Sequence, residues 1–261
     1  IINSDERQWT WMDEGLNTFL QYQTEREWTD ESGEAFPSRR GPAKLIVPYM
    51  GGDKRYISPI MSNSESIYQF GNNAYGKPCT ALNILRETVM GPELFDHAFK
   101  TYANRWMFKH PSPADLFRTM EDASAVDLDW FWRGWFYTND HCDVAMTGVK
   151  EFKVNFNNPS EGATKKSVSK SISKQAEAGQ FDPILQSIAR AEDPAKAYEL
   201  VKNNITDTRR DKLNEGNYFY QVDLKMIGGL VMPVIFKLEY ADGTSEEVRI
   251  PAEIWKMQNE R

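Results

Sequence analysis

The chain has 261 residues, 40% of them apolar and 13% aromatic, which is enough to bury a core in one or two domains. Its formal net charge of -7 at pH 7 argues against a nucleic-acid-binding surface, because such surfaces carry a basic face. Two cysteines are too few for a disulfide framework, and no apolar run reaches the roughly 18 residues that predict a membrane span. The sequence therefore predicts neither a nucleic-acid partner nor a membrane span.

Residues 1–147 are expected to be mainly helical. Near the start, apolar residues recur with the 3.6-residue period of a helix, which predicts a core-facing stripe made of Met12, Leu16, Phe19 and Leu20. Prolines and glycines then interrupt residues 36–59, and we expect a loop there because these residues break regular structure. A second helix should begin near Tyr75 or Pro78 and end at Gly91, since glycine is the preferred C-terminal cap.

Three further helices are expected in the first half of the chain. The first of them is marked by aromatic residues on one face, namely Phe95, Phe99, Tyr102 and Trp106. The next should start at Ser112 as N-cap, with Pro113 at the first helical position. The last should start at Asp127 and continue into the aromatic run 130–136, which we interpret as helix packing and not as a ligand cage.

The pattern changes in the second half of the chain. Residues 148–261 contain segments with the two-residue period of strands, and Ala241–Thr244 is typical of a tight hairpin connection. Polar and charged residues at about 157–208 predict a flexible or weakly helical insertion. We therefore expect an α+β fold: a helical domain over 1–147, then a small antiparallel β-sandwich over 148–261 that carries the insertion.

The segment WTWMDEGLNTFL raises a question about one acid. On a helical wheel, Glu14 lies roughly opposite the apolar stripe, so the ordinary interpretation is a solvated carboxylate on the outer face. Trp9, Trp11 and Tyr22, however, indicate that this second face is covered as well. A carboxylate on a covered face must be paired or bind a metal, and the pattern alone leaves both possibilities open.

The same segment resembles a motif of gluzincin metallopeptidases of the aminopeptidase N type, in which Asn-Glu-Gly or Asp-Glu-Gly on a helix supplies the third zinc ligand. Downstream, NAYGKPCTALNILRETVMG is similar to that family's Tyr-x-Lys-Gly segment and the helix after it. Residues 93–136 are similar to its closing helices, in which a Phe, a Tyr, a Lys, an Asp-Phe pair and a Trp recur. The resemblance covers about residues 1–145.

The resemblance implies a thermolysin-like catalytic domain and a role for several residues. Glu14 would be the third zinc ligand, and Tyr75 would donate its hydroxyl to the oxyanion that forms at the scissile carbonyl. Lys77 matches the lysine of the motif and is expected to make a structural or capping contact. Asp13 stands where Asn is commoner and would orient or cap rather than bind the metal. Pro78 replaces the family's usual Gly, so the local turn is expected to differ.

The H-E-x-x-H motif, which supplies two zinc histidines and the general base in that family, does not occur in the 261 residues. We therefore expect a C-terminal piece of a zinc-dependent aminopeptidase that removes N-terminal residues from peptides. Zn²⁺ is expected in the full-length parent, whereas this piece alone should be inactive and bind zinc only weakly. Its partners would be the peptide substrate and the missing N-terminal domains or another copy. The alternative is a non-catalytic relative that acts as a peptide-binding or scaffold module.

Other polar residues receive an ordinary interpretation. His97 should be exposed on a helix, and His110, which precedes a proline, should lie in a loop. Arg39 and Arg40 are interpreted as a solvated loop pair, with a substrate carboxylate or an acidic partner as the less favoured alternative. The lysines between residues 165 and 174 belong to the charged insertion, because the net charge is acidic.

Overall fold

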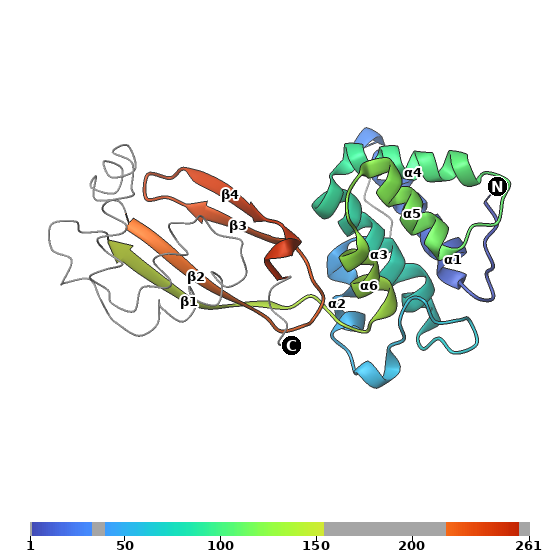
Figure 1. The fold of residues 1–261 in the computed structure, drawn as a ribbon, viewed down its shortest axis with the longest axis horizontal. Helices are drawn as coiled ribbons and strands as arrows, with labels where there is room; N and C mark the ends of the chain where they lie inside the picture. Colours follow the sequence, from blue (N-terminus) through green and yellow to red (C-terminus); the bar gives the residue numbers. More distant parts are fainter. Residues whose placement is uncertain (1, 33–39, 154–217, 256–261) are drawn as a thin grey trace. The chain divides into compact units, whose positions relative to one another are not determined.

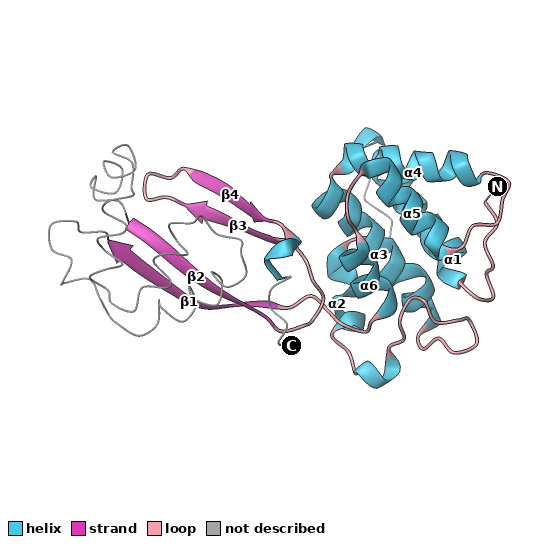
Figure 2. Cartoon of the chain, viewed as in Figure 1, coloured by secondary structure: helices cyan, strands magenta, loops and turns pink. Residues whose placement is uncertain are grey.

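The computed structural model describes residues 2–32, 40–153 and 218–255 (Figure 1). The chain divides into two compact units, formed by residues 1–143 with 226–261 and by residues 144–225. Along the described sequence the six α-helices come first and the strands follow them, as the colours of Figure 1 show, and Figure 2 distinguishes helices from strands by colour. The prediction of a mainly helical α+β fold is therefore confirmed.

The described residues form six α-helices: α1 (Thr10–Ser32), α2 (Ala43–Met50), α3 (Lys77–Ile84), α4 (Pro92–Trp106), α5 (Pro113–Ser124) and α6 (Asp129–Tyr137). Wider π-helical turns precede and follow α3, namely η2 (Gly71–Gly76) and η3 (Leu85–Met90). Two short 3₁₀ turns complete the helical structure, η1 (Lys54–Tyr56) and η4 (Ala252–Trp255). None of the described helices combines the length and the apolar character that crossing a membrane would require.

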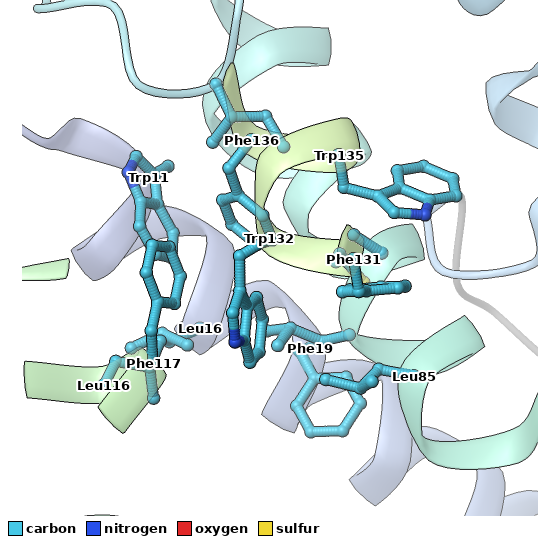
Figure 3. Close-up of a cluster of buried hydrophobic side chains, with 14 of the residues drawn as sticks. Trp11, Leu16, Phe19, Leu85, Leu116, Phe117, Phe131, Trp132, Trp135 and Phe136 are labelled. Atoms are coloured by element: carbon cyan, nitrogen blue, oxygen red, sulfur yellow. The ribbon is translucent and has the colours of Figure 1, made fainter. Parts of the chain in front are cut away.

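An aromatic core joins α1, α5 and α6 (Figure 3). The ring centroid of Trp11 lies 4.7 Å from that of Phe136, and Phe117 lies 4.5 Å from Trp132. Burying a large apolar side chain of this kind stabilises the fold by roughly 1.5–3 kcal/mol. The aromatic run of α6 is therefore helix packing, as predicted. The predicted stripe on α1 is buried at Met12, Leu16 and Phe19, whereas Leu20 is 49% exposed.

The stretch 36–59, which was expected to be rich in loops, contains the short helix α2, which was not predicted. Pro48 sits in the last turn of α2, where its missing N–H removes only one backbone hydrogen bond. The buried side chains of Ile46, Tyr49 and Met50 supply the apolar contact that holds this short helix. Tertiary packing therefore outweighs the two prolines that flank and interrupt the segment.

The predicted helix boundaries are mostly correct. Gly91 has a φ of 86°, a conformation that costs glycine little, and it separates η3 from α4. At the start of α5, the backbone N–H of Ser112 donates to Asp115 Oδ2 at 2.8 Å, and so does its hydroxyl. Asp127 accepts a hydrogen bond from the N–H of Asp129, but α6 begins two residues after it and not directly after it as predicted.

The strands form two two-stranded sheets, each antiparallel, with β1 (Val144–Lys153) beside β2 (Tyr218–Met226) and β3 (Val234–Glu239) beside β4 (Ser245–Ile250). The β3–β4 register pairs Phe236 with Val248. Their connection is the predicted tight turn, in which the N–H of Tyr240 donates to Thr244 O at 2.9 Å. The insertion predicted at 157–208 lies outside the described residues. The sandwich and the domain boundary between 147 and 148 therefore stay predictions.

Candidate active site

The face of α1 that carries Glu14 is partly covered. Trp11 and Thr18, which share this face, are buried, whereas Gln21 one turn further on is exposed. Glu14 itself is half-buried. Partial burial removes water from a carboxylate, which is unfavourable unless hydrogen-bond donors, a cationic side chain or a metal ion replace that water. The neighbours of Glu14 therefore indicate its role.

Gly15 allows α1 to approach the neighbouring segment very closely. A Cβ atom placed on Gly15 would lie 2.6 Å from Cγ of Pro78 and 3.1 Å from the carbonyl oxygen of Ala74. Both distances are shorter than normal contact, so any other residue would push α1 away from η2 and α3. The glycine within this acidic helix therefore has a packing role, since it sets how close Glu14 comes to the turn that carries Tyr75.

Tyr75 reaches Glu14 from the π-helical turn η2. Its hydroxyl donates a hydrogen bond to Glu14 Oε1, although the two residues lie 61 positions apart in the sequence. This bond to a carboxylate is the main reason why the pKa of Tyr75 is raised, and partial burial adds to the effect. The structure thus brings together the two residues that the resemblance singled out.

Two other side chains face the ring of Tyr75. The guanidinium carbon of Arg40 lies 4.6 Å from the ring centroid, within the range of a cation–π interaction. The ring of Phe70 lies 6.1 Å from that of Tyr75 at an angle of 57°. From the sequence, Arg40 was interpreted as part of a solvated loop pair, and its neighbours along the chain do not predict a contact with Tyr75.

Lys77 is fully buried and makes the capping contact that was expected of it. Its Nζ donates to the carbonyl oxygen of Thr138 at 3.0 Å, at the C-terminal end of α6. The pKa of Lys77 is lowered to about 8, chiefly by burial and also by the nearby charge of Lys54, whereas Asp140 acts in the opposite direction. Lys77 therefore ties the start of α3 to the end of α6.

Pro78 and Asp13 occupy ordinary helical positions. Pro78 lies in the first turn of α3, which continues directly from the π-helical turn η2, so the proline removes one backbone N–H from a continuous helical run. Asp13 lies in the first turn of α1, where the helix dipole favours a carboxylate. Burial raises the pKa of Asp13, and the charge of Glu14 raises it further. Asp13 makes no side-chain hydrogen bond to another described residue.

Glu14 has the properties of one metal ligand. Within the described part of the chain, no lysine, arginine or histidine nitrogen lies within 4.0 Å of its carboxylate. Oε1 accepts from Tyr75, and Oε2 has no hydrogen-bond donor among these residues. A half-buried anion with no cationic partner suits a divalent cation such as Zn²⁺. One carboxylate is a single candidate ligand, and among the described residues no group of three candidate ligands includes Glu14.

A separate group of three acids was not selected from the sequence. Glu121, Asp127 and Asp129 have carboxylate oxygens within 4.8 Å of one another, and they are the one set of three or more candidate ligands among the described residues. Glu121 Oε1 accepts from the N–H of Leu128 at 2.9 Å, and Asp127 accepts from that of Asp129. These bonds satisfy backbone N–H donors at the turn into α6, so Glu121 and Asp127 have a structural role at the start of that helix.

His97 and His110 take no part in this site. His97 is exposed on α4, as predicted. His110 is exposed in the loop before α5, where its Nδ1 lies 2.9 Å from Asn3 O.

Comparison with known proteins supports the resemblance. The model of the peptidase family M1 domain matches residues 3–135, about half of the 261-residue chain. The match includes the Glu14–Tyr75 pair, Lys77 and all six α-helices except the last two residues of α6. No curated protein and no solved structure matches the chain.

Proposed function

The chain belongs to peptidase family M1, and on that premise we propose that it supplies Glu14 and Tyr75 to the active site of a zinc-dependent aminopeptidase. The reaction is the hydrolysis of the first peptide bond of a peptide with a free N-terminus. The two histidine ligands and the general base would come from an H-E-x-x-H segment of the same longer polypeptide. The substrate is a peptide, and the identity of the residue removed is left open.

The single observation that carries the proposal is the hydrogen bond from the Tyr75 hydroxyl to Glu14 Oε1. It joins two side chains that lie on α1 and η2, elements that Gly15 allows to pack closely. A structural tyrosine would be expected to donate to a backbone carbonyl or to water. Donation to a half-buried carboxylate without a cationic partner instead supports a shared chemical role.

Each residue has a defined task in the proposed reaction. Glu14, with two histidines of the longer polypeptide, would hold Zn²⁺, and the bound ion would supply Lewis-acid activation of water and of the scissile carbonyl. Tyr75, like any tyrosine, is protonated at neutral pH, and so its hydroxyl can donate a hydrogen bond to the oxyanion that develops on the carbonyl. Gly15 keeps the helix that bears Glu14 close to the turn that bears Tyr75.

The proposal is tested with the full-length, zinc-loaded protein and peptides that differ only at the N-terminus. We expect hydrolysis of a peptide with a free amine and little hydrolysis of its N-acetylated form. Tyr75→Phe should lower kcat by about 100- to 1,000-fold, the usual effect of removing one oxyanion donor. Zinc content, measured by elemental analysis, should stay unchanged in this variant and fall in Glu14→Gln.

The outcomes separate this proposal from the alternative of a non-catalytic relative. A scaffold module would bind peptides equally well in the wild-type protein and in Tyr75→Phe, with no turnover in either. Equal turnover of the free and the acetylated peptide would exclude the aminopeptidase type while leaving a peptidase. Thr18→Val, a change on the same face of α1, is the matched control and should keep both zinc and activity.

A further inference from the structure

Arg40 lies over the ring of the proposed catalytic tyrosine. Its guanidinium carbon is 4.6 Å from the centroid of Tyr75, the shortest of the cation-to-ring distances in the described residues. The other such pairs, for example Lys109 over Trp106, have distances of 5.8 Å. A planar guanidinium at this distance can stack on the ring as well as attract it electrostatically.

The backbone that carries Arg40 is fixed against α1. Gly41 has a φ of 111°, and a Cβ atom on it would lie 2.3 Å from the ring of the buried Tyr22. Only glycine fits this position, both because of its φ and because the backbone lies flat on the aromatic ring. Arg40 is therefore held next to the helix that bears Glu14.

The segment after Arg40 is also fixed against the turn that bears Tyr75. The Cδ1 atom of Ile46, in α2, lies 3.2 Å from where a Cβ on Gly76 would be. Ile46 is buried, and Gly76 directly follows Tyr75. The stretch from Arg40 to Ile46 thus contacts both elements of the site, and the guanidinium is presented to Tyr75 by a well-packed backbone.

We propose that Arg40 is a positioning residue, which holds the Tyr75 ring so that its hydroxyl points at Glu14 and at the reacting carbonyl. The catalytic consequence rests on the proposed aminopeptidase function. Tyr75 is only half-buried, and its contacts are Glu14 at the hydroxyl, Phe70 beside the ring and Arg40 over the face. Removing Arg40 frees one face of the ring and lets the hydroxyl turn away from its acceptor.

A double-mutant cycle in the full-length, zinc-loaded protein tests this role. Arg40→Met should lower kcat by about 10-fold with little change in KM, since a small displacement of a catalytic group is costly. In the Tyr75→Phe background, Arg40→Met should cause no further loss, because Arg40 would act only through the hydroxyl. Arg40→Lys keeps a cation over the ring and should recover part of the rate. Lys109→Met, which removes another ring-stacked cation, should leave kcat unchanged.

A second readout does not depend on activity. With 3-fluorotyrosine incorporated at position 75, the ¹⁹F resonance should shift at constant pH when Arg40 is replaced by Met, and stay in place in Lys109→Met. An additive loss in Tyr75→Phe, or an unchanged ¹⁹F resonance in Arg40→Met, would overturn the proposal. If the wild-type protein hydrolyses no peptide, the proposed function fails, and the ¹⁹F shift alone decides whether Arg40 positions Tyr75.

Discussion

At the scale of single residues, the glycine of the acidic motif has a steric explanation. Glycine normally weakens a helix by about 1 kcal/mol relative to alanine, so its place inside α1 requires a compensating benefit. The benefit is the approach of α1 to Pro78, which a single Cβ atom would prevent. The hydrogen bond between Tyr75 and Glu14 depends on that approach.

Replacing Gly15 by alanine should therefore destabilise the protein and disturb the site together. The Cβ atom at 2.6 Å from Pro78 Cγ forces a shift, and overpacking of this kind costs about 1–3 kcal/mol. Urea unfolding measures the loss of free energy. Combining Gly15→Ala with Pro78→Gly removes the two closest colliding atoms and leaves the Ala74 carbonyl oxygen at 3.1 Å, so the double variant should lose less than the sum of the single variants. Simple additivity would contradict the steric account.

The sequence predicted some of these residues but not their contacts. The helical period places Glu14 opposite the apolar stripe, and its neighbouring aromatics indicated a covered face, which left an ion pair and a metal as alternatives. The motif resemblance selected Glu14, Tyr75 and Lys77 as candidates. Neither could show that the Tyr75 hydroxyl meets Glu14 or that Arg40 lies over the ring, because these contacts depend on how α1, η2 and the start of α2 pack.

At the scale of elements, Lys77 joins two helices that are distant in the sequence. Its ammonium group is fully buried and donates to the carbonyl oxygen of Thr138, the residue directly after α6, where the helix dipole favours a positive charge. Because burial disfavours the charged form, the pKa of Lys77 falls from 10.5 to about 8. The contact therefore gives the helical unit a measurable dependence on pH.

Stability should rise with pH in the alkaline range because of Lys77. Between about pH 8 and pH 10.5 the unfolded chain still binds the proton that the folded chain has lost, so the free energy of unfolding increases with pH. We expect the difference between wild type and Lys77→Met to grow by on the order of 3 kcal/mol across this window. Urea unfolding of both proteins at several pH values measures it. A difference that stays flat or falls would show that Lys77 titrates normally.

The elements themselves were predicted where the local chemistry is specific. Ser112 with Pro113 and the glycine at position 91 mark helix ends by their side chains and backbone freedom, and the structure has ends there. The helix α2 was missed because two prolines suggested a loop, while its stability comes from the burial of Ile46 and Tyr49 against other elements. Local signals therefore predicted the boundaries, and long-range packing decided the exceptions.

At the scale of the whole molecule, the proposed zinc site has one candidate ligand among the described residues. Glu14 offers a carboxylate without a cationic partner among them, and no second candidate ligand from the described histidines, cysteines or acids forms a group of three with it. Zinc binding and stability are linked, because an ion that binds only the folded protein stabilises it. The change in Tm on adding zinc therefore shows whether a given length of the chain contains enough ligands to bind the ion.

Zinc should stabilise the full-length protein but not the 261-residue chain alone. At a zinc concentration of about 100 times Kd, the free energy of unfolding rises by about 2.7 kcal/mol, which thermal unfolding detects as a higher Tm. Glu14→Gln should lose this increase, whereas Glu121→Gln, in the other acidic group, should keep it. A zinc-dependent Tm in the 261-residue chain that disappears in Glu14→Gln would contradict the expectation.

The hydrogen bond between Tyr75 and Glu14 also has a consequence for the order of folding. It closes a loop of 61 residues, and the contact of Lys77 with Thr138 spans another 61. Contacts of such long sequence separation form late, because the chain entropy of the whole loop is lost before they can stabilise it. The paired side chains therefore come together only once α1, α3 and α6 have docked. A partly folded chain would carry every one of these residues and still lack the site.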